Sequence, residues 1–298
     1  VGFRLQYDED GKYEKVNDDK KEILDLYSKV VSLFHSVLIL YPQGEEALNY
    51  LKNRGITKET IEKFQLGFAP KERNWLYNFL IKKSYTPQFL AKTGLFSSKY
   101  NNIAFFSNRI MFPIFDRYGT PIAFGGRRFS GEEGPKYLNT KDMEQYKKGN
   151  SLFAFSLAMK GIREKKSVIL CEGYMDVIKA HQNGMKNAVA LMGTNIDNNK
   201  LKEVLSLVKK ITLSLDNDEA GSKAQIEIGN RIIQTTDNVY KLKFSGAKDL
   251  DEFLTDKNLK NTNFDAQSYV TNNKEHFINF KIEYCKDVAK TNIEQRIK

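Results

Sequence analysis

Acidic residues follow three of the apolar runs in this chain, at the point where each run ends. The runs span residues 167–171, 211–215 and 239–242, and the acids after them are Glu172, Asp216, Asp218, Asp249 and Asp251. Five carboxylates gathered at one place would repel each other unless a cation neutralised them. Hard divalent cations prefer oxygen ligands, so the pattern predicts a site for Mg²⁺ or a similar ion.

The spacing of these acids fits a metal site, although each of them has a simpler explanation when taken alone. In an extended segment, side chains at positions i and i+2 point the same way, so both carboxylates of an Asp-x-Asp pair can face one cluster. Taken singly, each acid could be a helix N-cap or a surface charge, and Asp218 or Asp251 could cap the helix that it precedes. Three acidic strand ends in order favour the metal site.

The elements that must position the acids alternate regularly between strand and helix. We predict strands at 167–171, 188–192, 211–215 and 239–242, and helices at 174–183, 198–208 and 219–235. Such alternation with short connections indicates parallel βαβ units, and therefore an α/β fold. In open parallel sheets, chemistry gathers at the carboxyl ends of the strands, which is where the acids stand.

The amino-terminal half reads differently, as a mixture of helices and one hairpin. Helices are predicted at 19–40, 45–53, 74–83 and 86–92, with a short one capped by Thr57. Residues 110–115 and 121–124 flank a turn and predict a β-hairpin, followed by Gly125 and Gly126. After about residue 258 the pattern is again helical.

Positive charge is concentrated in the middle of the chain. The 298 residues carry a net charge of +10, and residues 71–166 hold 18 Lys and Arg against 7 Asp and Glu. Aromatic residues are interleaved with these cations, as in proteins that bind single-stranded nucleic acid. A solvated lysine-rich surface remains the alternative, and most of the rings fit a core. The segment favours a polyanion partner, with nucleic acid first.

Cysteine and histidine counts exclude other chemistries. Two Cys and three His, without close spacing, predict no zinc site in this part of the chain. A Ser-His-Asp site would have to use scattered histidines. The two cysteines fit a reducing, cytoplasmic compartment. The apolar run 30–41 is too short for a bilayer span, no signal peptide is visible, and the ends look like those of a fragment.

Three acidic motifs resemble those of a Toprim domain, and their wording resembles bacterial DnaG-type DNA primase. They are Glu172-Gly-Tyr-Met-Asp176, Asp216-Asn-Asp218 with Glu219-Ala-Gly221, and Lys248-Asp-Leu-Asp251. Upstream segments resemble the same family: residues 51–56, 64–70, 108–114, 124–127 and 135–139. The departure is Asn217, where relatives often carry Gly; both neighbouring acids are kept.

The resemblance implies an RNA polymerase core that synthesises short RNA primers on single-stranded DNA. It implies three units: an α+β subdomain with a basic ridge (1–165), a Toprim domain (166–257) and a truncated helical subdomain (258–298). It also implies ribonucleoside triphosphates as substrates, and a zinc-binding domain and a helicase-binding domain outside this chain. No membrane partner is expected.

The resemblance also assigns roles to residues. Glu172, Asp216 and Asp218 would be catalytic, and these three with Asp249 and Asp251 would hold two or more Mg²⁺ or Mn²⁺ ions. Nucleotides or DNA would contact a set of ridge residues: Arg109, Arg127, Lys136, Tyr137, Asn139 and Lys148. Lys147 and Arg128 are adjacent alternatives, and the role of Asp176 stays open.

Two other classes use the same acids. A Toprim nuclease or topoisomerase would cleave DNA, the latter through a tyrosine, and Tyr174 inside the acidic motif fits packing better than attack. A non-catalytic DNA-binding adaptor could tolerate the loss of the acids, whereas this chain keeps all five. Start-site preference, the physiological metal and the oligomeric state are not determined by these patterns.

Overall fold

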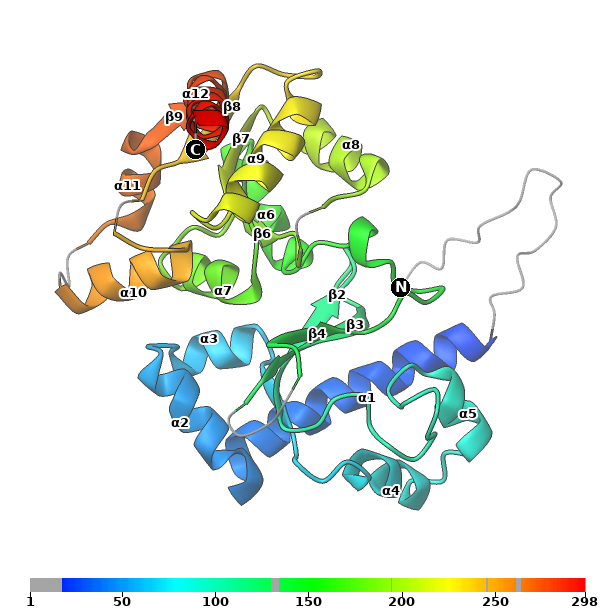
Figure 1. The fold of residues 1–298 in the computed structure, drawn as a ribbon. Coiled ribbons are helices and arrows are strands. Elements are labelled where there is room, and N and C mark those ends of the chain that lie inside the picture. Colours follow the sequence, from blue (N-terminus) through cyan, green and yellow to red (C-terminus); the bar gives the residue numbers. More distant parts are fainter. Residues whose placement is uncertain (1–17, 130–133, 194, 245, 261–263, 298) are drawn as a thin grey trace, which may run out of the picture.

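A computed structural model describes residues 18–297 apart from 130–133, 194, 245 and 261–263. Residues 1–17 of the expected amino-terminal subdomain therefore lie outside the described residues. The described chain contains two sheets, a four-stranded sheet in the order β1-β2-β3-β4 and a five-stranded sheet in the order β6-β5-β7-β8-β9. Figure 1 shows them in two stacked halves, each with its own helices. This is the expected α/β class.

The first sheet is antiparallel and contains the predicted hairpin. Its strands are β1 (Gly67–Ala69), β2 (Arg109–Phe115), β3 (Pro121–Arg128) and β4 (Tyr137–Asn139). β3 continues through Gly125 and Gly126, where it pairs with β2 on one side and β4 on the other, and neighbouring side chains approach the backbone closely there. A Cβ on Gly125 would lie 2.3 Å from the Tyr174 hydroxyl. The glycine therefore lets the second half of the molecule approach this sheet.

Five helices surround the first sheet, close to the predicted ranges. They are α1 (Asp18–Leu40), α2 (Glu45–Asn53), α3 (Lys58–Lys63), α4 (Trp75–Lys82) and α5 (Pro87–Lys92). The predicted cap of α3 is present, since the Thr57 side chain accepts a hydrogen bond from the Thr60 amide at 3.3 Å. By length and apolarity alone α1 could cross a bilayer. One of its faces is buried here, with Leu26, Tyr27 and Val30 fully enclosed.

The second sheet consists of four parallel strands and one antiparallel strand. They are β5 (Ser167–Cys171), β6 (Ala188–Ala190), β7 (Lys210–Ser214), β8 (Val239–Leu242) and β9 (Lys274–His276). In β5, Ile169 and Cys171 belong to one buried cluster, and Val168 and Leu170 belong to another on the opposite face. Such a strand, buried on both faces, was predicted from its continuous apolar run.

The helices of this half cover both faces of the sheet. They are α6 (Phe155–Lys165), α7 (Tyr174–Gln182), α8 (Asn198–Leu207), α9 (Glu219–Ile232), α10 (Leu250–Lys260), α11 (Ala266–Asn272) and α12 (Phe277–Ile297). The segment after residue 258 is not entirely helical. Lys274–His276 pair with β8, His276 opposite Tyr240. A three-residue strand has no periodicity of its own, so only the neighbouring strand reveals it.

The two sheets share one hydrophobic core. Phe112 on β2 stacks on Tyr174 of α7, with ring centroids 4.7 Å apart, and Phe153 meets Tyr174 edge-on at 4.8 Å. Phe64, after α3, stacks on Phe153 at 5.8 Å. Because buried aromatic contacts cross between the halves, residues on the first sheet are held at a fixed distance from the acids of the second.

Burial of His181 in α7 predicts a loss of stability in acid. Its Nε2 lies 2.9 Å from the Ala188 carbonyl oxygen, and burial lowers the pKa of the imidazole to about 4. Because the unfolded state binds a proton first, near pH 6.5, folding loses free energy as the pH falls from 6.5 towards 4. At pH 5 this term is about 2 kcal/mol. Urea unfolding at pH 7 and pH 5 should show His181→Gln losing less stability than wild type; equal losses would contradict the assignment.

Candidate active site

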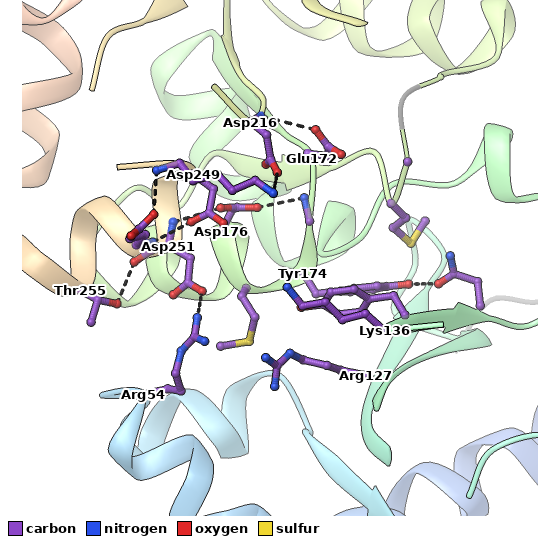
Figure 2. A pocket seen from close by; sticks show the side chains of 18 of the residues that line it. Arg54, Arg127, Lys136, Glu172, Tyr174, Asp176, Asp216, Asp249, Asp251 and Thr255 are labelled. Atoms are coloured by element: carbon purple, nitrogen blue, oxygen red, sulfur yellow. Dashed lines mark hydrogen bonds and ion pairs between the residues drawn. The ribbon is translucent and has the colours of Figure 1, made fainter. Parts of the chain in front are cut away.

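The predicted acids meet at the carboxyl ends of the second sheet. Glu172 follows β5, Asp216 follows β7 and Asp249 lies in the loop between β8 and α10. All three line a cleft of about 700 Å³ (Figure 2). Its other wall is formed by Arg127 of β3, Lys136 just before β4, and Tyr137 and Asn139 of β4. A single cleft therefore brings the acidic and the basic groups of the sequence together.

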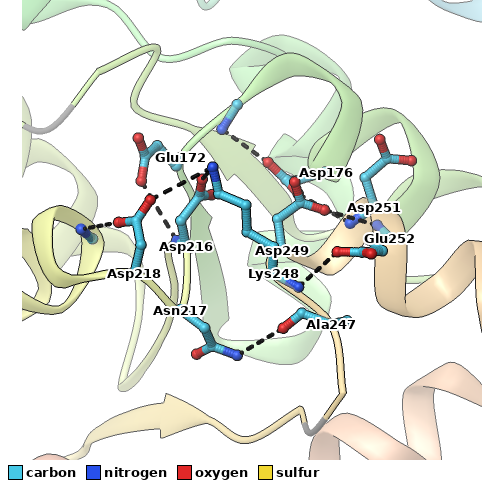
Figure 3. Close-up of polar contacts among 12 residues, drawn as sticks. Glu172, Asp176, Asp216, Asn217, Asp218, Ala247, Lys248, Asp249, Asp251 and Glu252 are labelled. Carbon is cyan, nitrogen blue, oxygen red and sulfur yellow. Dashed lines mark hydrogen bonds and ion pairs between the residues drawn. The ribbon is translucent and has the colours of Figure 1, made fainter.

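Burial and mutual repulsion raise the pKa values of two of these acids. For Glu172 the largest cause is burial, followed by the charge of Asp216; for Asp216 it is burial, followed by the charge of Asp249. The Asp216 amide donates to Glu172 Oε2 at 3.4 Å. Lys248 is the nearby cation, with its Nζ 3.5 Å from a carboxylate oxygen of both Asp216 and Asp218 (Figure 3). The cluster thus holds more negative charge than its surroundings balance easily.

Asp218 is both a member of this cluster and a helix cap. Its side chain accepts a hydrogen bond from the Gly221 amide at 2.9 Å and caps α9. That hydrogen bond, more than the Lys248 charge, lowers the pKa of the Asp218 carboxyl. The capping explanation drawn from the sequence is therefore correct. It does not exclude a ligand role, because the second oxygen of Asp218 faces Lys248.

Asp251 lies differently from the other four acids. Only 3% of it is exposed, and its carboxylate pairs with Arg54, at the end of α2, rather than facing Glu172 (Figure 2). Its amide donates to Asp176 Oδ1 at 3.0 Å, and Asp176 Oδ2 accepts from the Gly173 amide at 3.0 Å. Burial raises the pKa of both carboxyls, while Arg54 opposes this for Asp251. Asp176 thus ties the loop after β5 to the start of α10.

The ridge residues are placed unequally. Arg127 lines the cleft with its guanidinium 4.8 Å from the centre of the Tyr50 ring, and Lys136 lines it nearby. Asn139 accepts a hydrogen bond from the buried Tyr174 hydroxyl. Burial raises the pKa of Tyr137 well above its usual range. Lys148 does not line the cleft itself, but its ammonium lies 3.2 Å from where a Cβ would stand on Gly193, which does line it.

Arg109 is the ridge residue that the structure places elsewhere. It is 5% exposed, and its guanidinium donates to the carbonyl oxygens of Gly126 at 3.2 Å and Pro135 at 3.1 Å. It does not line the cleft among the described residues. Its contacts instead fix the segment just before Lys136, so it positions the ridge from behind.

Sequence reasoning gave no role to Arg54, which also lines the cleft. It stands where α2 ends, beside Gly55, and that pattern reads as an ordinary helix stop. Its partner Asp251 is 197 residues away. The only signal in the sequence was that Arg54 lies within residues 51–56, a segment that resembles the family. Thr255 and Asp256 of α10 line the cleft as well.

The donor set fits a hard divalent cation. Glu172, Asp216 and Asp249 offer carboxylate oxygens, the ligands that such an ion prefers. Burial and then neighbouring carboxylates raise the pKa values of Glu172 and Asp216, and a bound cation would relieve the repulsion among these carboxylates. Within the described residues, no three His, Cys, Asp or Glu side chains converge closely enough to form a ligand set as they stand. Lys248 lies among the carboxylates, and a bound ion would displace its ammonium from Asp216 and Asp218.

Comparisons with known proteins agree with this geometry. The family model for the amino-terminal domain of the DNA primase catalytic core matches residues 34–159, and a Toprim-like model matches residues 169–254. The DNA primase of Treponema pallidum (strain Nichols) is 45% identical over 203 residues, 68% of this chain and 33% of that protein. That of Staphylococcus aureus (strain COL) is 33% identical over 276 residues, 92% of this chain and 45% of that protein.

Solved structures give the same result. A DNA primase domain from Pseudomonas aeruginosa superposes with a TM-score of 0.76 at 29% identity, covering 88% of this chain and 82% of that one. The zinc-binding and RNA polymerase domains of Aquifex aeolicus primase superpose with a TM-score of 0.74 at 28% identity, covering 95% and 68%. A DnaG primase catalytic domain bound to single-stranded DNA gives 0.76 at 25% identity, covering 90% and 83%.

These matches define a class in which a primase-specific core precedes a Toprim domain. The chain belongs to the family of bacterial DnaG-type DNA primases. It spans between one third and one half of the length of the curated relatives described above.

Proposed function

We propose that this chain joins ribonucleotides into short RNA primers on a single-stranded DNA template. The observation that carries the proposal is the cleft itself, with Glu172, Asp216 and Asp249 on one wall and Arg127 and Lys136 on the other. Nucleotidyl transfer needs charge neutralisation and positioning more than covalent help from the protein. The acidic wall would act on phosphates through bound metal ions, and the basic wall would bind the remaining phosphate oxygens directly. Together they would provide the charge neutralisation and the positioning.

The carboxylate wall would hold two or more Mg²⁺ or Mn²⁺ ions, which supply charge neutralisation and activation of the attacking hydroxyl when bound. Asp216, Asp218 and Asp249 are the proposed ligands, and Glu172 is a ligand or orients the 3′-hydroxyl. Glu172 suits that role because burial and Asp216 raise its pKa, so its carboxyl lies closer to accepting a proton than a free one. Asp251 would act mainly through Arg54.

The basic wall would hold the nucleotide and the template. The Arg127 guanidinium suits bidentate phosphate contacts, and the Lys136 ammonium supplies a looser point charge. Tyr137, Asn139 and Lys148 would complete the contacts to nucleotide or DNA. A helicase and a zinc-binding domain, both outside this chain, are proposed partners, and a cytoplasmic location at the replication fork follows from that role.

The test is incubation of the protein with single-stranded DNA, labelled ribonucleotides and Mg²⁺ or Mn²⁺. Short RNA products that depend on the template are expected. Metal-dependent cutting of the DNA without incorporation would favour a nuclease instead.

The Tyr174 ring is enclosed by Phe112 and Phe153, and its hydroxyl donates a hydrogen bond to Asn139. That tyrosine is therefore not available as a DNA-cleaving nucleophile.

Removing the Tyr174 hydroxyl is expected to weaken nucleotide binding selectively. Tyr174→Phe keeps the stacked ring and removes the hydrogen bond that orients the Asn139 amide. We expect the KM for ribonucleotides to rise about fivefold, the equivalent of one hydrogen bond, with little change in kcat. Tyr118→Phe, at an 84% exposed position, is the control. An unchanged KM with a lower melting temperature would show that the hydroxyl serves only the fold.

A further inference from the structure

A second cavity, of about 310 Å³, opens at the amino ends of β5 and β7. The acidic cleft stands at the carboxyl ends of the same two strands, so the cavity lies at the other end of the sheet. None of the residues that line the cavity lines the cleft. Gln267 and Thr271 of α11 form its outer rim.

The floor of this cavity is partly polar although it is buried. Alternate residues of the strands face it, Ser167 and the apolar Ile169 from β5 and Lys210 with Thr212 from β7. Asn187 precedes β6 and donates from Nδ2 to the carbonyl oxygen of Ser167 at 3.0 Å and to its Oγ at 3.1 Å. Ser167, Asn187 and Thr212 are 8%, 4% and 3% exposed. A floor of hydroxyl and amide groups suits a hydrogen-bonding ligand.

The charge of the cavity has one sign. Lys165, Lys210 and Lys274 line it, and no Asp or Glu does so within the described residues. Burial and the adjacent Lys210 lower the pKa of Lys274. The neighbouring acid Glu275 is paired with Lys243 at 3.2 Å, outside the lining. The Lys165 ammonium donates to Gln267 Oε1 at 2.9 Å, and the Lys274 ammonium lies 4.8 Å from the centre of the Tyr240 ring. Three ammonium groups without a carboxylate among them make the cavity attractive to an anion.

We propose that this cavity binds a phosphate group, carried either by the backbone of a nucleic acid or by a nucleotide. Lys165 and Lys210 reach it from the end of α6 and the start of β7, and Lys274 reaches it from β9. Ammonium groups bind phosphate oxygens as point charges, and the hydroxyl and amide groups of the floor can share the remaining oxygens. The site does not depend on catalysis in the cleft.

Protection of single lysines from acylation tests this proposal residue by residue. The whole chain is treated with an acylating reagent, and modification of each lysine is followed by mass spectrometry. One arm adds inorganic tripolyphosphate and the other adds a single-stranded oligonucleotide. Lys209 is the internal control, because it is exposed, adjacent to Lys210 and outside the lining. At a ligand concentration about ten times the dissociation constant, Lys210 and Lys274 should react about tenfold more slowly, by mass action.

Protection in both arms would indicate a general phosphate site, and protection by one probe alone would identify its source as nucleotide or nucleic acid. In the double variant Lys210→Gln/Lys274→Gln, protection of Lys165 should disappear. If neither probe slows the acylation of Lys210 and Lys274 more than that of Lys209, the proposal is wrong. Primer synthesis is not measured in this experiment. A negative result would therefore count against the phosphate site and not against the proposed function.

Discussion

Replacing Asp216 with asparagine is expected to reduce primer synthesis by about 10³-fold or more, the loss expected when a charged group that stabilises a transition state is removed. Asparagine keeps the shape of the side chain and one oxygen, but it replaces the other oxygen with an NH₂ group and has no negative charge. Asp216 lies between Glu172, which accepts from its amide, and Asp218, with which it shares Lys248. Losing its charge therefore removes the centre of the proposed metal site rather than its edge.

The same substitution should leave the fold intact or stabilise it in the absence of metal. Burial and the charge of Asp249 raise the pKa of Asp216, so the folded state holds this proton more tightly than the unfolded state. For such an acid, stability falls as the pH rises above the unfolded-state pKa, about 4, and the loss is complete above the folded-state pKa. At neutral pH the ionised Asp216 thus costs folding free energy, which asparagine does not.

Metal-dependent melting separates this explanation from a structural one. Mg²⁺ or Mn²⁺ should raise the melting temperature of the wild-type protein and raise that of Asp216→Asn much less. Asp265→Asn is the matched control, since asparagine is as good an N-cap for α11 as aspartate is. Full primer synthesis by Asp216→Asn would show that Asp216 is not part of the active site. A metal-induced rise in melting temperature as large in Asp216→Asn as in the wild type would show that Asp216 is not a metal ligand.

Sequence alone predicted the elements whose signals are local. The strand Ser167–Cys171 has the predicted bounds, because a five-residue apolar run between polar residues marks both of its ends. The acid after it is then placed by the geometry of parallel sheets. β1, β4 and β9, at three residues each, were missed because pairing with a neighbouring strand creates them. Patterns along a chain record periodicity, whereas short edge strands depend on what lies beside them.

Sequence patterns also could not predict the orientation of side chains whose partners are distant in the sequence. Arg109 was assigned to the ridge by its motif, yet its donors are used by the carbonyl oxygens of Gly126 and Pro135. Asp251 was grouped with Asp249 by spacing, but the first turn of α10 turns its carboxylate to Arg54. In both cases the residue type was compatible with the proposed chemistry, and a tertiary contact decided the orientation.

Replacing Arg54 with glutamine is expected to lower the free energy of unfolding by about 2 kcal/mol. Breaking a fully buried ion pair costs about 3–5 kcal/mol, because the remaining charge stays buried without compensation. Here the Arg54 side chain is 35% exposed, which reduces the loss, while that of Asp251 is only 5% exposed. Lys179, 2% exposed, stabilises the Asp251 charge in part and limits the loss further.

A double-mutant cycle with Asp251→Asn shows whether the two residues act together. Urea unfolding should show a coupling of more than about 1 kcal/mol, since Asp251→Asn removes the charge that Arg54→Gln strands. Lys52→Gln, exposed on the same helix, is the control and should change stability by less than about 0.5 kcal/mol. Zero coupling, with a metal-induced melting shift abolished by Asp251→Asn, would make Asp251 a metal ligand. With strong coupling and that shift retained, Asp251 holds Arg54 at the mouth of the cleft and joins α2 to α10 across it.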